Sequence, residues 1–199
     1  MKLCSGRHAR WCAHVNGVFA TPDMRGWLSD TVSLTRKLIA HSTRFRVERL
    51  RQQQGVCLAD EFHTVGLARP IRVQEREVLL RCDDRPVVFA HTIVPLAATA
   101  SDWPFFGTLG ERSLGTTLFG DPRVARGTLQ YARLHAQHPL VRRASAALGQ
   151  KHFVSPLFAR RCLYRRKNGV LLVTELFLPA LADLISLPRH HARLDESTR

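Results

Sequence analysis

Short apolar runs that end at turn residues mark the C-terminal third of this chain and are typical of β-strands. Residues 157–167 and 170–178 form two such runs around Asn168-Gly169, a pair that favours a tight two-residue turn. The pattern therefore predicts a β-hairpin. With the turn at Asn168-Gly169, Cys162 would lie opposite Glu175.

The rest of the chain predicts further strands and short helices. A second hairpin is expected from 71–82 and 86–94, joined by a turn at 83–85. A helix start is indicated at Thr21-Pro22, because Thr21 can cap the first turn and Pro22 fits its first position. The remaining expected elements are a ragged helical stripe from Trp27 to Ile39, a strand or short helix at 44–56, a short helix at 114–119, a strand at 126–134 and a helix at 139–148.

Hairpins joined by short helices indicate an α+β domain built on a mostly antiparallel sheet. The sequence contains no internal repeat and no linker that would divide it. We therefore expect one domain at 21–187, preceded by an N-terminal extension at 1–20. We expect the last segment, 188–199, to be disordered.

Composition places this domain among soluble globular proteins. The chain has 199 residues, of which 45% are apolar and 23% charged, enough for one substantial core. It has no apolar run of the roughly 20 residues that a membrane span needs, and no secretory signal. Five scattered cysteines without a Cys-x-x-Cys motif argue against disulfides or zinc, and His135-x-x-His138 lacks a third ligand nearby. We expect a reduced, cytoplasmic protein without a metal site.

The charge of the chain is strongly positive. Thirty Lys and Arg residues against sixteen Asp and Glu residues give a formal net charge of +14. On sign alone, the partner could be nucleic acid, an anionic membrane surface or an acidic small molecule. The basic residues are spread along the chain, however, and form no recognition-helix pattern and no aromatic–basic strand motif. We interpret them as a solvated basic surface and expect no nucleic-acid partner.

One acidic residue interrupts the most apolar run in the chain. Between 170 and 179, Glu175 is the only charge, and on a strand it would share its face with apolar side chains. A carboxylate buried there needs a partner or must keep its proton. Arg76 is the best candidate partner, because its neighbours at alternating positions are also apolar. Such a pair either braces the core or lines a pocket for a small polar ligand.

These segments also resemble a known family. The segments 76–80, 89–95, 114–119 and 174–179 occur in the same order in chorismate pyruvate-lyases, and the resemblance runs from about Trp27 to Leu181. It implies an enzyme that splits chorismate into 4-hydroxybenzoate and pyruvate, the first committed step of ubiquinone synthesis, without a cofactor. It also implies one antiparallel sheet, with helices and flap-like segments that close over an internal site.

The same resemblance assigns roles to individual residues. Arg76 would bind the ring carboxylate of chorismate, a task that suits the planar guanidinium group. Glu175 would face the ring hydroxyl, as a base, an acid or an orienting group, and burial can raise its pKa toward working pH. The main chain at Leu114 would add a hydrogen-bond donor, and the main chain at Leu34 would make a second contact. His91 stands where many family members carry Arg, and we expect a core or pocket-edge histidine.

Two other functions fit parts of the sequence. The fold resemblance extends to ligand-sensing domains of bacterial transcription regulators, which bind small molecules without turning them over. Charge alone would fit a nucleic-acid-binding protein, although this leaves Arg76 and Glu175 unexplained. Under the lyase hypothesis, we expect a monomer that passes its product to a membrane-bound prenyltransferase.

Overall fold

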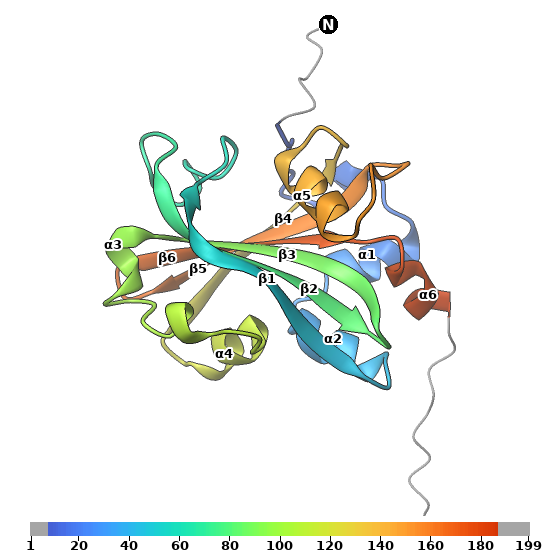
Figure 1. The fold of residues 1–199 in the computed structure, drawn as a ribbon, viewed down its shortest axis with the longest axis horizontal. Helices are drawn as coiled ribbons and strands as arrows, with labels where there is room; N and C mark the ends of the chain where they lie inside the picture. The colour runs from blue at the N-terminus through green and yellow to red at the C-terminus, as the bar shows by residue number, and fades with distance from the viewer. Residues whose placement is uncertain (1–7, 187–199) are drawn as a thin grey trace, which may run out of the picture.

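The strands expected from the sequence assemble into one sheet that crosses the molecule (Figure 1). The computed structural model describes residues 8–186. Within these residues, six strands pair in the order β1-β2-β3-β6-β5-β4, and every neighbouring pair is antiparallel. The strands are β1 (Phe45–Val56), β2 (Arg72–Cys82), β3 (Arg85–Pro95), β4 (Val124–Leu134), β5 (Leu157–Arg166) and β6 (Gly169–Phe177). The expected α+β class with an antiparallel sheet is confirmed.

Short helices precede the first strand, connect later strands and follow the last one. Thr21 caps the first of them through its side-chain oxygen, as expected. The stripe from Trp27 to Ile39 belongs to two helices instead of one, because a turn at 29–33 separates them. Within this turn, the side chain of Asp30 accepts a hydrogen bond from the N–H of Val32. The helices are α1 (Pro22–Leu28), α2 (Leu34–Ala40), α3 (Leu96–Thr99), α4 (Leu114–Gly120), α5 (Pro139–Ala147) and α6 (Leu181–Ser186), with 3₁₀ turns η1 (Val15–Val18) and η2 (Phe106–Thr108).

The C-terminal hairpin forms, but its register is shifted by two residues from the expected one. The turn is Lys167-Asn168, one position earlier than expected. Arg160 consequently lies opposite Glu175, in the place that the expected turn gave to Cys162. Because residues two apart on a strand share a face, the shift changes the neighbour of Glu175 but not the side of the sheet that Glu175 faces.

Gly169 explains this difference in register. It is the first residue of β6, and a Cβ atom at this position would lie 2.5 Å from Cβ of Asp102. The strand therefore needs glycine at this position, because the backbone of β6 lies close to Asp102. Lys167 adopts the left-handed conformation of the turn, with φ of 53°. The Asn-Gly pattern predicts a turn because glycine adopts turn conformations easily. In this structure Gly169 is instead a strand residue, and its lack of a side chain makes room for Asp102.

Helices and long connections cover the two faces of the sheet. In Figure 1, α2 and α4 lie below the sheet, whereas α5 and the connection 57–71 between β1 and β2 lie above it. Side chains follow the alternation of the strands: on β2, Arg76 lines a pocket below the sheet, and Glu77 contacts Arg143 of α5 above it. Buried apolar side chains fill both layers. The sheet thus separates the pocket from a second packed layer.

Residues before position 21, expected as an extension, pack against the sheet. Val18 and Ala20 are buried in the core, and Cys12 forms an isolated bridge with Tyr131 of β4. The packed domain therefore includes residues on the N-terminal side of the expected boundary. The segment 188–199 lies outside the described residues. Among residues 8–186, no helix is long and apolar enough to cross a membrane.

Candidate active site

The pocket lies on the lower face of the sheet, and a single row of paired residues forms its floor. From β2 to β4 the row is Arg76, Thr92, Val173, Cys162 and Leu129, each the cross-strand partner of the next. All five line the pocket, which encloses about 640 Å³ of empty space, counting the part that opens to solvent. Strand pairing thus gathers residues from distant parts of the sequence into one site of the size that small molecules occupy.

Two short helices cover the pocket with their first turns. Leu34 begins α2, Leu114 begins α4, and both residues line the pocket. The N–H groups in the first turn of a helix have no partner within that helix, so main-chain donors are present at both positions. The two helices approach closely at Gly115, where a Cβ atom would lie 2.9 Å from Oγ of Ser33.

Arg76 is buried in the pocket without an acidic partner among the described residues. Only 3% of its surface is exposed. Its Nη2 donates hydrogen bonds to the carbonyl oxygens of Gly110 and Arg112, at 2.9 Å each. Burial, together with the neighbouring charge of Arg49, lowers the pKa of Arg76 to about 10. A buried guanidinium group whose charge is not balanced is suited to bind an anion.

Arg160, and not Arg76, is the partner of Glu175. Nε of Arg160 donates a hydrogen bond to Oε2 of Glu175 at 2.5 Å, a charge-assisted contact. The expected pairing of Arg76 with Glu175 is therefore wrong. Arg160 lies directly opposite Glu175 in the shifted hairpin, whereas Arg76 is two strands away on β2. Arg76 and Glu175 nevertheless line the same pocket.

Arg160 also connects the site to helix α1. Its Nη1 donates hydrogen bonds to the carbonyl oxygens of Trp27, Leu28 and Asp30 at 3.1, 3.2 and 3.0 Å, where the end of the helix leaves carbonyl groups without partners. The guanidinium group thus balances the charge of Glu175 and fixes its orientation. Oε1 of Glu175 has no hydrogen-bond partner among residues 8–186 and is available to a ligand.

Among the polar pocket residues that sequence reasoning missed are Arg126, Arg160 and Tyr164. Arg160 and Tyr164 share a face of β5 with Cys162, and this alternation was a usable signal. Arg126 gave no such signal, because an irregularity in the β4–β5 pairing follows it and breaks the alternation along β4. Burial, with the nearby Cys162 and Glu175, raises the pKa of Tyr164 above its usual range, so its hydroxyl stays protonated.

His91 belongs to a buried charged cluster on the upper face of the sheet. Its Nδ1 lies 3.2 Å from Oε1 of Glu77, and its Nε2 lies 3.3 Å from Oε1 of Glu61. Burial lowers the pKa of His91, but the two carboxylates outweigh this effect and raise it to about 9. Its neighbours Ala90 and Thr92 line the pocket and His91 does not. His91 is therefore a core residue, and the expected alternative of a pocket-edge position is wrong.

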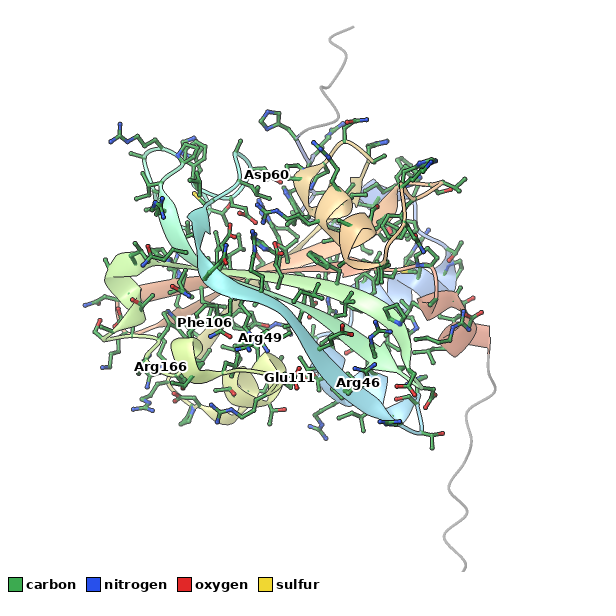
Figure 2. The ribbon with its side chains drawn as sticks, viewed as in Figure 1. Arg46, Arg49, Asp60, Phe106, Glu111 and Arg166 are labelled. Atoms are coloured by element: carbon green, nitrogen blue, oxygen red, sulfur yellow. The ribbon has the colours of Figure 1, made fainter. Side chains whose placement is uncertain are left out.

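His138 has a structural role at the start of α5. Its Nδ1 accepts a hydrogen bond from the N–H of Leu140, and its Nε2 lies 3.3 Å from Oδ2 of Asp60. Figure 2 shows Asp60 near α5, above the sheet, whereas Phe106 and Glu111 lie on the side of α4. The part of the chain that the structure describes holds no group of three His, Cys, Asp or Glu side chains arranged to bind a metal ion.

An antiparallel sheet with a pocket on one face, lined by buried arginines and one ion-paired glutamate, defines an α+β domain that can hold a small anion. A model of the chorismate lyase family matches residues 7–185, and the chain belongs to this family. A protein of Ralstonia nicotianae, named "Probable chorismate pyruvate-lyase", is 48% identical over 180 residues, which cover 89% of this chain and 84% of the relative. A relative of the same name from Cupriavidus metallidurans is 46% identical, with 87% and 81% covered.

Solved structures share the fold. PhnF from Mycobacterium smegmatis matches with a TM-score of 0.52 and 17% identity, over 76% of this chain and 65% of that chain. A structure of the PhnF C-terminal domain matches with a TM-score of 0.51 and 16% identity, over 70% and 86%. At these identities the likeness shows the arrangement of the sheet and its helices alone.

Proposed function

We propose that this protein splits chorismate into 4-hydroxybenzoate and pyruvate. The observation that carries the proposal is Arg76, a buried guanidinium group whose hydrogen bonds go to main-chain oxygens and whose charge is unbalanced in the pocket. A carboxylate on a small ring would supply the missing negative charge. Membership of the chorismate lyase family and the names of the relatives support the same substrate.

The reaction depends on positioning more than on strong catalytic groups. The bond between the ring and the enolpyruvyl ether oxygen breaks, and the neighbouring ring carbon, which carries the hydroxyl, loses its proton. The enolpyruvate that leaves gains a proton and becomes pyruvate, so protons balance. Because the ring becomes aromatic, the step is strongly downhill. The pocket must hold the ring, place a polar group at the scissile end and exclude water.

The proposed roles follow from positions in the pocket. Arg76 would bind the ring carboxylate, and the main-chain N–H groups of Leu114 and Leu34, at the starts of two helices, would add donors. Oε1 of Glu175 would accept a hydrogen bond from the ring hydroxyl. Because Arg160 balances Glu175, this contact adds no net negative charge beside the anionic substrate.

Incubation of the purified protein with chorismate, with both products followed together, tests this function. We expect 4-hydroxybenzoate and pyruvate to appear in equal amounts. Glu175→Gln and Arg76→Ala should keep the fold but lower turnover by at least about 100-fold. The matched controls Glu111→Gln and Arg165→Ala change exposed side chains outside the pocket and should keep full activity.

Full activity of Glu175→Gln or of Arg76→Ala would contradict the assignment of the site. Binding of chorismate without turnover would instead indicate a sensor domain of this fold. Neither binding nor turnover would contradict the substrate, and the basic surface would then be tested against nucleic acid.

We further propose that the protein acts as a cytoplasmic monomer and passes 4-hydroxybenzoate to a membrane-bound prenyltransferase. The role of the family in ubiquinone synthesis supports this placement. Light scattering on the purified protein tests the monomer, and fractionation of cells tests the location.

A further inference from the structure

Arg126 brings a second unbalanced positive charge to the pocket. It lies on β4, and its Nη1 donates a hydrogen bond to the carbonyl oxygen of Thr31. Its Nε is buried and has no hydrogen-bond partner among residues 8–186. Its guanidinium group lies over the ring of Phe119 of α4, 5.5 Å from the centroid. The described residues supply no carboxylate that forms an ion pair with it, so its charge is available to a ligand.

The charges in the pocket match a dianion. The charged side chains that line it are Arg76, Arg126, Arg160 and Glu175. Glu175 and Arg160 neutralise each other, so Arg76 and Arg126 leave the pocket with two net positive charges. Chorismate carries two carboxylates, one on the ring and one on the enolpyruvyl group, whereas 4-hydroxybenzoate carries one. Complementary charge favours the ligand with both carboxylates.

The two unbalanced arginines reach the pocket from opposite ends of its floor, on β2 and on β4. Three strands lie between β2 and β4, which makes four strand-to-strand spacings, and at about 4.8 Å per spacing the two backbones lie roughly 19 Å apart. The guanidinium groups of Arg126 and Arg160 donate hydrogen bonds to the carbonyl oxygens of two adjacent residues, Thr31 and Asp30, and Arg160 forms an ion pair with Glu175. Arg126 therefore lies toward the Glu175 end of the pocket.

The geometry of chorismate fits this separation. Its enolpyruvyl ether is next to the ring hydroxyl, and its ring carboxylate is on the far side of the ring. With the ring carboxylate at Arg76 and the hydroxyl at Glu175, the enolpyruvyl group points toward Arg126. We propose that Arg126 binds the enolpyruvyl carboxylate of chorismate and thereby selects the substrate over 4-hydroxybenzoate. This inference rests on the proposed function.

Replacing Arg126 by Gln tests the inference by comparing two ligands. We expect kcat/KM for chorismate to fall by about 10- to 150-fold, the effect of losing a hydrogen bond to a charged group. The Kd for 4-hydroxybenzoate, measured by calorimetry, should change little, because this ligand lacks the second carboxylate. Arg126→Lys keeps the charge and should recover part of the loss. Circular dichroism checks the fold of both variants.

Two control variants distinguish binding of the enolpyruvyl carboxylate from a general effect of losing an arginine. Arg76→Gln should weaken the binding of both ligands, since both carry the ring carboxylate. Arg133→Gln changes an exposed side chain of the same strand, outside the pocket, and should affect neither.

If Arg126→Gln weakened 4-hydroxybenzoate binding as much as it lowered kcat/KM for chorismate, the inference would be overturned. Arg126 would then only hold Thr31 and Phe119 in place beside the pocket. An unchanged kcat/KM for chorismate would overturn it as well. Failure of the proposed function itself would appear earlier, as a wild-type protein that does not turn over chorismate at all.

Discussion

The three arginines of the pocket have the same chemistry and different partners, and the partners decide what each can do. The guanidinium group of Arg160 is engaged by Glu175 and by the carbonyl groups at the end of α1, so it holds other groups in place. Arg76 and Arg126 have only main-chain oxygens as hydrogen-bond acceptors among the described residues. Their charges are therefore free to act on a ligand.

The role of Arg160 can be measured as a change in stability. Arg160→Gln should lower the free energy of unfolding by about 3–5 kcal/mol, because Glu175 loses its buried partner. Urea unfolding measures the loss. With Glu175→Gln already present, the loss caused by Arg160→Gln should be smaller by at least about 1 kcal/mol. Equal losses in the two backgrounds would contradict an ion pair between these residues.

At the scale of elements, the hydrophobic pattern predicted where strands and helices form and which strands make hairpins, but not the register of the C-terminal hairpin. Arg76 and Glu175 could be recognised because a charge in an apolar strand is conspicuous. The partner of Glu175 could not, because register depends on Gly169, whose packing against Asp102 no local pattern reveals. The polar segment 44–56 was ambiguous for a related reason: as the edge strand β1 it has only one buried residue, Val47, and few apolar positions to show a period.

The connection 57–71 is held to the sheet by a cluster of charges. Glu61 of this connection contacts His91 of β3, which also contacts Glu77 of β2. Arg143 of α5 and Arg51 of β1 reach the same cluster through Glu77. A protonated imidazole carries a positive charge that both carboxylates attract, and its Nδ1 is hydrogen-bonded to Glu77. Protonation of one buried histidine therefore contributes to the attachment of this connection, beside the contacts that Asp60 makes with His138 and Arg161.

Stability should therefore fall at alkaline pH. Folding raises the pKa of His91 from 6.5 to about 9, so its contribution is fully present below pH 6.5 and is lost as the pH rises through about 9. Over this range we expect the stability advantage of the wild type over His91→Gln to shrink by about 3 kcal/mol. Urea unfolding at a series of pH values measures it. An advantage that does not change with pH would contradict a charged His91.

At the scale of the whole molecule, the net charge of +14 surrounds a site that is proposed to take a dianion. Raising the ionic strength from about 0.01 M to about 0.15 M shortens the Debye length from about 30 Å to about 8 Å. We expect kcat/KM for chorismate to fall several-fold over this range, because long-range attraction aids encounter, while kcat changes less. A constant kcat/KM would show that the surface charge does not serve the substrate.

The order of the strands also determines when the sheet can be completed during synthesis of the chain. β6 is the last strand of the described residues to leave the ribosome, yet it lies between β3 and β5 in the sheet. Until it is synthesised, β1–β3 and β4–β5 are separate units, each with an exposed edge that can pair with other chains. The strand that closes this gap also carries Glu175. A chain truncated before β6 therefore lacks both the strand that joins the two units and the carboxylate of the pocket.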